Sequence, residues 1–330
     1  MAAADRIWSD ARPSFLDEQF QFRRLTRRRL NRAAVLLAAL ICFITPACES
    51  QYLRITFLGD VMLGRGIDQA AGRTEDWRPF TQLTPVIDQA DILAANLESP
   101  LTDAPAVTGG YLLCAPPRHA EALKAASFDL VTVANNHIAD CGTAGTRQTL
   151  SILRSAGITV AGPDAEPVYL TVRGRKLAFI ALDDVSRPVD ESRAEEVIRK
   201  AALRSDLVLL SIHWGGEYQP APSSRQRALA RQLVQAGADI IIGHHPHVIQ
   251  PMERISRASG KFDALVFYSL GNALFDQHGL PDTRRGAGVT LIFGVDGIPR
   301  YSVFMFEIDP ARGVITRFLP DTTIDVIKNQ

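Results

Sequence analysis

Cysteine is scarce in this sequence, and no two cysteines have the CxxC spacing. Two of the four, Cys42 and Cys48, lie in an apolar N-terminal stretch, which leaves Cys114 and Cys141 in the body of the chain. This argues against a structural zinc site built from cysteine. Cys114 and Cys141 would either form one disulfide in an oxidising compartment or remain two small buried side chains. We expect the second, since a body of this size does not need a cross-link.

Net charge is also absent, because 36 basic side chains balance 36 acidic ones. This balance gives no indication of a nucleic-acid-binding surface. It conceals an asymmetry, since residues 1–32 carry a surplus of arginine and the chain from residue 49 onward is mildly acidic. With 46% hydrophobic and 22% charged residues, and no repeat after residue 50, the composition is that of a globular protein able to bury a core.

The apolar stretch AAVLLAALICFITPA, residues 33–47, is shorter than the roughly 20 residues that a membrane span needs. It follows the basic RRLTRRRLNR and ends in small residues before Cys48, as a signal peptide does. TPAC also resembles a lipobox, and TRRRLNR resembles a twin-arginine signal. We expect residues 1–48 to be a basic N-terminal segment with a signal peptide or a membrane or lipoprotein anchor. The protein would then be exported to the periplasm or to the outer face of the cell membrane; the alternative is a buried helix of a cytosolic protein.

Beyond this segment, apolar strand-like runs alternate with amphipathic stretches. The runs read as buried strands at 53–59, 90–98, 128–137, 176–184, 205–215 and 238–245. Helices are predicted at 146–157 and 223–237, each closed by a glycine. After residue 260 the pattern changes to strands separated by turns. The sequence therefore predicts an α/β fold with a β-rich C-terminal third, in one domain from about 52 to 320.

Polar side chains end five of these predicted strands. The five endings contain Asp60, Asn96 and Glu98, Asn135 to His137, His213, and His244 to His247, and so hold five of the seven histidines. In open α/β sheets, ligands gather beyond the carboxyl ends of the strands, so these groups could converge in space. Each ending alone could be an ordinary turn or a hydrogen-bonded core histidine. Together they predict a shared metal site.

Carboxylate oxygens and imidazole nitrogens are donors that suit Zn²⁺, Mn²⁺ or Fe. A carboxylate that bridges two such ions would make a clamp for phosphoryl transfer, with a water activated by one ion. A nearby imidazole could protonate the leaving group. We therefore expect one or two divalent ions as the cofactor. An exported binding domain without metal would require all five endings to be coincidental.

Six blocks of the sequence match a known family, in order, between about residues 53 and 276. They are GDVMLGR (59–65), NLESPLT (96–102), ANNHIADCG (134–142), HWGGEY (213–218), GHHPHVIQ (243–250) and YSLGNALFD (268–276). Together they resemble the poly-γ-glutamate capsule biosynthesis (CapA) family, which is similar to the calcineurin-like metallophosphoesterases. The resemblance implies a four-layer αββα sandwich of two β-sheets flanked by helices. It also implies a membrane-associated role in making or exporting the γ-linked glutamate polymer.

The resemblance assigns roles to single residues. It implies that the metal ligands are Asp60, the bridging Glu98, Asn136, His213, His245 and His247, and that His137 is the general acid. His244 would lie behind these ligands without binding the ion. Supporting or substrate-binding positions would be Asn135, Asp140, Glu217, Arg65 and Asn272. Asp140 could hold the ring of His137, Glu217 could orient His213 or meet a substrate amine, and Arg65 could contact an anionic substrate or be an ordinary surface arginine.

Three departures from the phosphoesterase pattern weaken the analogy of activity. Met62 stands where the Asp-x-His motif has histidine, and a thioether is a poor ligand for a hard divalent ion. The first metal site would thus bind its ion weakly or stay empty, or the centre would hold a single ion. Ile138 replaces the aspartate that normally follows Asn-His, and the bridging aspartate is the longer Glu98. Fold alone does not establish function.

Two functions remain in competition at this point. The first is a metal-dependent hydrolase of the cell envelope, cutting a phosphoester or a γ-glutamyl amide. The second is a non-catalytic accessory subunit that binds anionic polymer in a synthesis or export complex. Expected partners are polyglutamate or another anionic envelope substrate and membrane synthase or export subunits, with no nucleic acid. The mildly acidic body is a poor match for a polyanion, which favours the hydrolase.

Overall fold

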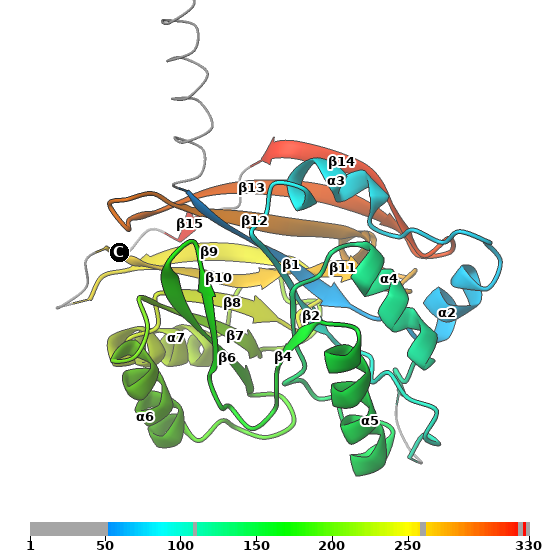
Figure 1. The fold of residues 1–330 in the computed structure, drawn as a ribbon, viewed down its shortest axis with the longest axis horizontal. Helices are drawn as coiled ribbons and strands as arrows, with labels where there is room; N and C mark the ends of the chain where they lie inside the picture. The colour runs from blue at the N-terminus through cyan, green and yellow to red at the C-terminus, as the bar shows by residue number, and fades with distance from the viewer. Residues whose placement is uncertain (1–51, 108–110, 258–261, 323–325, 328–330) are drawn as a thin grey trace, which may run out of the picture. The chain divides into compact units, whose positions relative to one another are not determined.

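The computed structural model describes residues 52–107, 111–257, 262–322 and 326–327 (Figure 1). The predicted N-terminal segment, residues 1–48, lies outside the described residues. Tyr52–Gln330 form one compact unit of the chain. In the part of the chain that the structure describes, no helix is long and apolar enough to cross a membrane.

Two mixed β-sheets form the centre of this unit. The first sheet has the order β14-β13-β12-β1-β2-β3-β4, with β11 paired to β1. Its strands are β1 (Leu53–Val61), β2 (Ile92–Leu97), β3 (Leu130–Thr132), β4 (Thr159–Ala161), β11 (Asn272–Leu274), β12 (Arg285–Phe293), β13 (Pro299–Asp309) and β14 (Val314–Thr322).

The second sheet has the order β15-β9-β10-β8-β7-β6-β5. Its strands are β5 (Val168–Val172), β6 (Arg175–Asp183), β7 (Leu207–His213), β8 (Ile240–His244), β9 (Ile249–Ile255), β10 (Ala264–Leu270) and β15 (Val326–Ile327). Strands β6, β7 and β8 run parallel to one another, as β1, β2 and β3 do in the first sheet. The predicted strands therefore exist, but they divide between two sheets.

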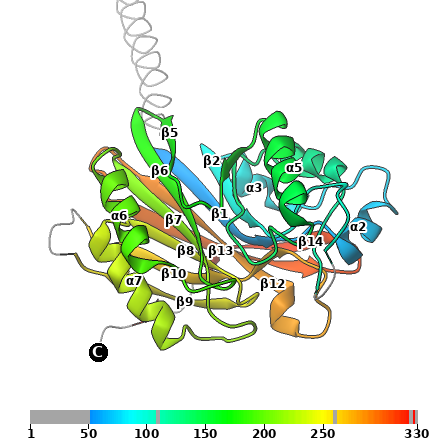
Figure 2. The ribbon, with the colours of Figure 1, turned by 90° about the horizontal axis from the view of Figure 1, so that it is seen from below.

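Helices cover the outer face of each sheet, as Figures 1 and 2 show. The first sheet carries α2 (Arg65–Ala71), α3 (Thr84–Ile87), α4 (Ala120–Ala125) and α5 (Gly142–Ser155), with short 3₁₀ turns at Thr81–Leu83 and Pro117–His119. The second carries α6 (Glu191–Ala202) and α7 (Ser224–Ala236), and a third 3₁₀ turn, Pro281–Arg284, precedes β12. The architecture is the four-layer αββα sandwich that the resemblance implied.

Three apolar layers hold the four structural layers together. The inner layer lies between the sheets and includes Ile55, Phe57, Phe179, Leu209 and Phe267, all buried. Alternate residues of each strand face this layer, and the others face the helices, because side chains on a strand point to opposite faces in turn. Both faces of the central strands are therefore buried, which explains why the runs read as nearly continuous apolar sequence.

The helices agree with the sequence analysis to different degrees. The predicted helix 223–237 is confirmed as α7, which begins at a Ser223–Gln226 capping box and ends at Gly237 with φ 126°. Helix α5 begins at Gly142, four residues before the predicted start at 146. The predicted strand 128–137 is too long, since β3 covers only Leu130–Thr132 and the polar residues beyond it form a turn.

Cys114 and Cys141 form a disulfide with an S–S distance of 2.02 Å, so the prediction that they stay unpaired is wrong. The prediction considered only the size of the body. The need for a cross-link is local, because the described residues between β2 and the turn before α4, 98–107 and 111–116, contain no helix and only the isolated bridge between Leu101 and Ala115. The disulfide fastens this irregular segment to the start of α5.

Candidate metal centre

The five polar strand endings meet at one edge of the two sheets. In the first sheet Asp60 of β1 is paired in register with Asn96 of β2. In the second sheet His213 of β7 is paired with His244 of β8. Since the strands in each set are parallel, their carboxyl ends lie together. The sandwich brings the two sets face to face, and Asn96 Nδ2 of one sheet lies 3.4 Å from His213 Nδ1 of the other.

A missing side chain allows this approach of the sheets. Gly59 precedes Asp60, and a Cβ atom at Gly59 would lie 1.8 Å from the Gly271 carbonyl oxygen. The Asp60 N–H donates to that same oxygen at 3.0 Å. Only glycine permits this backbone contact between β1 and the turn after β10. The glycine therefore sets the position of Asp60 in the site.

Glu98 lies at the centre of the site. Its Oε1 is 3.6 Å from His213 Nε2, 3.8 Å from His137 Nε2 and 3.9 Å from His247 Nε2. The side chain is fully buried, yet neither carboxylate oxygen has a hydrogen-bond partner among the described residues. Native proteins rarely leave a buried polar atom unpaired, so these oxygens require an explanation.

Asp60 is held from several directions. Its Oδ1 accepts from Asn96 Nδ2 at 2.8 Å, and its Oδ2 accepts from the His245 backbone N–H at 3.1 Å. His244 Nδ1 lies 3.1 Å from Oδ1, and His247 Nδ1 lies 3.5 Å from Oδ2. His244 thus contacts the carboxylate of a proposed ligand, which fits the position behind the ligands that the sequence suggested.

The ligand atoms of these residues fall into three overlapping sets that could hold a metal ion. In each set the atoms lie within 4.8 Å of one another, and the sets are Glu98–His213–His245, Asp60–Glu98–His247 and Glu217–His245–His247. His213 Nε2, His245 Nδ1 and Asn136 Oδ1 are also buried without a hydrogen-bond partner in the described part of the chain. Unpaired oxygens and imidazole nitrogens that converge on one point are a donor set for a divalent cation, so the residues present fit a metal.

Burial and mutual charge shift the protonation of the site. Burial lowers the pKa of His213 and His247, and it lowers that of His245 to about 4. These imidazoles are therefore neutral at pH 7, which is the form that binds metal. Burial raises the pKa of Glu98 well above its usual value, and the negative charge of Asp60 raises it further.

The pKa of Asp60 moves in the opposite direction. Burial alone would raise it, but the contact with His244 and the interactions with the nearby His213 and His247 lower the pKa of Asp60 below the usual range. One carboxylate of the pair is therefore stabilised as an anion by its neighbours. The pKa of Glu98 is raised, so Glu98 would need a bound cation to ionise as readily as Asp60.

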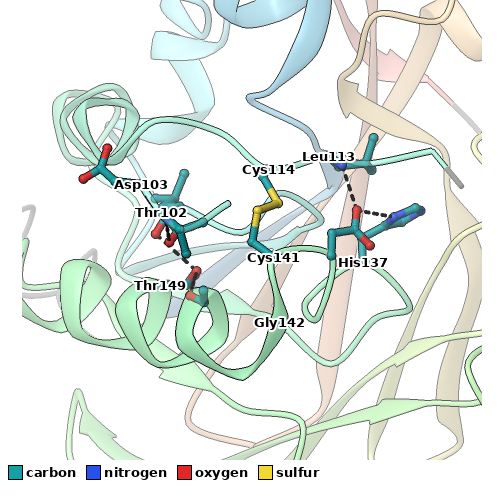
Figure 3. The surroundings of a disulfide bond; sticks show 12 residues. Thr102, Asp103, Leu113, Cys114, His137, Cys141, Gly142 and Thr149 are labelled. Carbon is teal, nitrogen blue, oxygen red and sulfur yellow. Dashed lines mark hydrogen bonds and ion pairs between the residues drawn. A yellow bond between two sulfur atoms is a disulfide. The ribbon is translucent and has the colours of Figure 1, made fainter. Parts of the chain in front are cut away.

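His137 is oriented by a carboxylate. Its Nδ1 lies 2.9 Å from Asp140 Oδ2, and the Leu113 N–H donates to that same oxygen at 2.7 Å (Figure 3). Each of these two partners is next to a cysteine of the disulfide, Cys114 beside Leu113 and Cys141 beside Asp140. With Nδ1 engaged, Nε2 faces Glu98. The structure thus places Asp140 where the sequence analysis suggested, against the ring of His137.

Other candidate residues surround this group. Asn135 donates to Asn96 Oδ1 at 3.0 Å and to the Leu97 carbonyl at 2.9 Å. Asn272 Oδ1 lies 2.9 Å from His247 Nδ1 and so fixes that ring. Asn96 was quoted in the sequence analysis without a role, although its spacing of two from Glu98 on an extended strand already put both side chains on one face.

Arg65 is not an ordinary surface arginine. Its Nε donates to Asp276 at 3.1 Å, and the Gly66 N–H donates to the same carboxylate at 3.0 Å. The guanidinium also lies over the Phe275 ring, 5.8 Å from its centroid. Its charge lies near enough to Glu98 to oppose the rise of that pKa, so Arg65 borders the site.

Met62 does not face the metal ligands as a donor. The side chain is buried in the apolar layer between the first sheet and its helices. Its Sδ accepts from the Gly64 N–H at 3.1 Å. The imidazole that the phosphoesterase pattern has at this position is therefore not replaced by the thioether.

All residues of this centre lie in the part of the chain that matches a known protein family. The family model described as "Bacterial capsule synthesis protein PGA_cap" matches residues 54–277. The chain belongs to this family. The matched range contains every candidate ligand of the metal centre.

Two related proteins come from Bacillus. The chain is 31% identical over 257 residues to "Capsule biosynthesis protein CapA" of Bacillus anthracis, covering 69% of this chain and 61% of that protein. It is 32% identical over 282 residues to "PGA biosynthesis protein CapA" of Bacillus subtilis, covering 78% and 72%. A "Probable polyglutamine synthesis accessory protein" of Mycobacterium tuberculosis is 26% identical over 67% of this chain and 74% of that protein.

One solved structure has a similar fold. It is a hypothetical protein from Thermus thermophilus, with a TM-score of 0.53, 19% identity, and coverage of 77% of this chain and 99% of that one. At this identity the likeness concerns the fold only.

Proposed function

We propose that this PGA_cap family member is a metal-dependent hydrolase of the cell envelope that acts in poly-γ-glutamate capsule synthesis. The observation that carries the proposal is Glu98, a buried carboxylate without a hydrogen-bond partner among the described residues, with three imidazole nitrogens 3.6–3.9 Å from one oxygen. A buried anion in such surroundings is tolerated when a cation neutralises it. Family membership and the names of the Bacillus relatives support the role in capsule synthesis.

The donors divide into two sets around the shared Glu98. Asp60, Glu98 and His247 would hold one divalent ion, and Glu98, His213, His245 and Asn136 the other. The cofactor would be one or two ions of Mn²⁺, Zn²⁺ or Fe, supplying Lewis acidity and a lowered pKa of water. The scissile bond would be a phosphoester or a γ-glutamyl amide.

His137 would supply the proton to the leaving group. Asp140 accepts the Nδ1 hydrogen and so keeps Nε2 directed toward Glu98 and the centre. The same carboxylate stabilises the ring when it is positively charged. Arg65, fixed by Asp276 at the border of the site, would bind an anionic group of the substrate such as a glutamate carboxylate or a phosphate.

Export to the cell envelope is part of the proposal. The N-terminal basic and apolar sequence is that of a signal peptide or anchor, lipid or helix. The Cys114–Cys141 disulfide is of the kind that persists in oxidising compartments such as the periplasm. Polyglutamate would be the substrate or product at the outer face of the membrane, next to membrane synthase or export subunits.

The second candidate is a non-catalytic accessory subunit of that machinery, which would bind anionic polymer at the same centre. It is favoured by the name of the Mycobacterium relative, which calls that protein a synthesis accessory protein. The two candidates differ in one property. A hydrolase needs His137, whereas polymer binding tolerates its loss.

Metal content and hydrolysis together test the proposal. The full chain is loaded with Mn²⁺ or Zn²⁺, and its activity is measured on a phosphodiester and on γ-linked glutamate peptides. We expect bound metal in the wild type, loss of metal in His245→Ala, and at least about 100-fold lower activity with metal retained in His137→Ala. His278→Ala, at a histidine outside the centre, is the matched control. A wild-type protein that binds no stoichiometric metal would contradict the proposal. Full polymer binding without hydrolysis would favour the accessory role.

A further inference from the structure

Glu217 is a carboxylate that belongs to one of the three donor sets but was assigned to neither of the two proposed ions. One of its oxygens lies within 4.8 Å of ligand nitrogens of both His245 and His247. The residue is exposed, whereas both imidazoles are buried. Glu217 thus approaches the centre from the solvent side. Its negative charge also opposes the lowering of the pKa of both imidazoles, which is consistent with this proximity.

The loop that carries Glu217 is fastened to the segment that carries the imidazoles. The Tyr218 N–H donates to the Pro246 carbonyl at 2.8 Å, and Gln250 Nε2 donates to the Gln219 carbonyl at 2.9 Å. Tyr218 Oη accepts from Gln277 Nε2 at 3.1 Å on the other side. These contacts hold Glu217 next to His245 and His247 as a fixed part of the site.

One of the proposed ions has only three side-chain donors. Asp60, Glu98 and His247 provide three side-chain donors for their ion, and Met62 provides none because its sulfur is engaged by Gly64 within the apolar layer. Divalent ions of this kind take four or more ligands. The oxygens of the buried Glu98 have no hydrogen-bond partner among the described residues. This is independent evidence that the cluster of carboxylates and imidazoles is a cation site and not an acidic surface patch.

We propose that Glu217 is a metal ligand, which adds a carboxylate oxygen, from the solvent side, to the ion that lies beside His245 and His247. This rests on the metal centre of the proposed function and completes it. With Glu217 the centre has three carboxylates, Asp60, Glu98 and Glu217, and three imidazoles, His213, His245 and His247. Three carboxylates also leave two divalent ions with a surplus of one positive charge for an anionic substrate.

The test uses the full chain and counts metal. Wild type, Glu217→Gln and Glu217→Asp are stripped with chelator, loaded with Mn²⁺ and desalted, and metal per chain is measured by mass spectrometry. Mn²⁺ affinity is measured by calorimetry. Glu121→Gln, at an exposed glutamate of α4, is the control. Because Glu217 is exposed, the metal-free variants should have the same melting temperature as the metal-free wild type. This comparison separates loss of a ligand from misfolding.

We expect Glu217→Gln to lose one equivalent of Mn²⁺, or to bind it at least about tenfold more weakly, with Glu217→Asp intermediate and Glu121→Gln unchanged. Unchanged content and affinity in Glu217→Gln would overturn this role and leave the metal centre standing. A wild type that binds no metal would overturn both. Loss of metal in His245→Ala but not in Glu217→Gln would also reject Glu217 as a ligand, and the ligands named under the proposed function would stand.

Discussion

The Glu98 carboxylate is fully buried, and neither of its oxygens has a hydrogen-bond partner among the described residues. Removing a charge from water without pairing it is unfavourable, so this residue opposes folding when no cation is bound. The same property would make it a strong metal ligand. At the scale of single residues, Glu98 therefore lowers the stability of the metal-free protein and would raise its affinity for metal.

Glu98→Gln keeps the shape of the side chain and removes the charge, so we expect it to abolish metal binding and to stabilise the metal-free protein. Burial raises the pKa of Glu98 above 4.5, so the folded state holds this proton more tightly than the unfolded chain. The resulting stability is fully present below pH 4.5 and is lost as pH rises toward the folded pKa, by up to about 1.4 kcal/mol per pH unit. The gain from Glu98→Gln should thus be larger at pH 8 than at pH 5.

Urea unfolding in the presence of chelator measures this difference. Glu196→Gln, at an exposed glutamate of α6, controls for loss of a carboxylate elsewhere. A metal-free Glu98→Gln protein less stable than the wild type at pH 8 would contradict the argument.

At the scale of elements, much of the site could be predicted because its residues come directly after the strands. A buried parallel strand has a recognisable apolar run, and the residues after that run must lie at the carboxyl edge of the sheet. Asp60, Glu98 and His213 were located this way. The assignment of strands to sheets could not be predicted, since a run buried on both faces looks the same in either sheet.

Helix α6 was missed for a related reason. Its buried face consists of Ala194, Ile198 and Ala201, and two alanines among many charged residues make a weak apolar pattern. The disulfide was missed because it secures residues 98–107 and 111–116, where the structure describes almost no secondary structure, and composition does not reveal this local need. Glu217 lies on a loop, where no strand ending indicates its direction.

Gly59→Ala should damage the junction of the elements that form the site. The added Cβ would lie 1.8 Å from the Gly271 oxygen, so β1 must move away from the turn after β10. We expect a loss of about 3 kcal/mol in the free energy of unfolding and weaker metal binding, because Asp60 moves with the strand. Gly279→Ala, where a Cβ would meet nothing within 4 Å, should change neither quantity. Thermal melting and Mn²⁺ titration decide, and a Gly59→Ala protein with wild-type metal affinity would show that the contact does not position Asp60.

At the scale of the whole molecule, two sheets supply the candidate ligands of one centre, and a disulfide secures the irregular segment beside it. The bond joins cysteines 27 positions apart, so its loss frees a loop of that size in the unfolded chain. Reduction should then lower the free energy of unfolding by about 3 kcal/mol.

Urea unfolding with and without reductant measures the effect of the Cys114–Cys141 bond, with a Cys114→Ser/Cys141→Ser variant as the control in which reductant changes nothing. Asp140, next to Cys141, orients His137, and the N–H of Leu113, next to Cys114, donates to the same Asp140 oxygen. Reduction should therefore lower hydrolysis more than metal content. A reduced protein, verified by thiol labelling of the tryptic peptides, with an unchanged unfolding midpoint would refute the stabilising role. Equal loss of metal and activity would instead mean that the disulfide supports the whole centre and not the proton donor in particular.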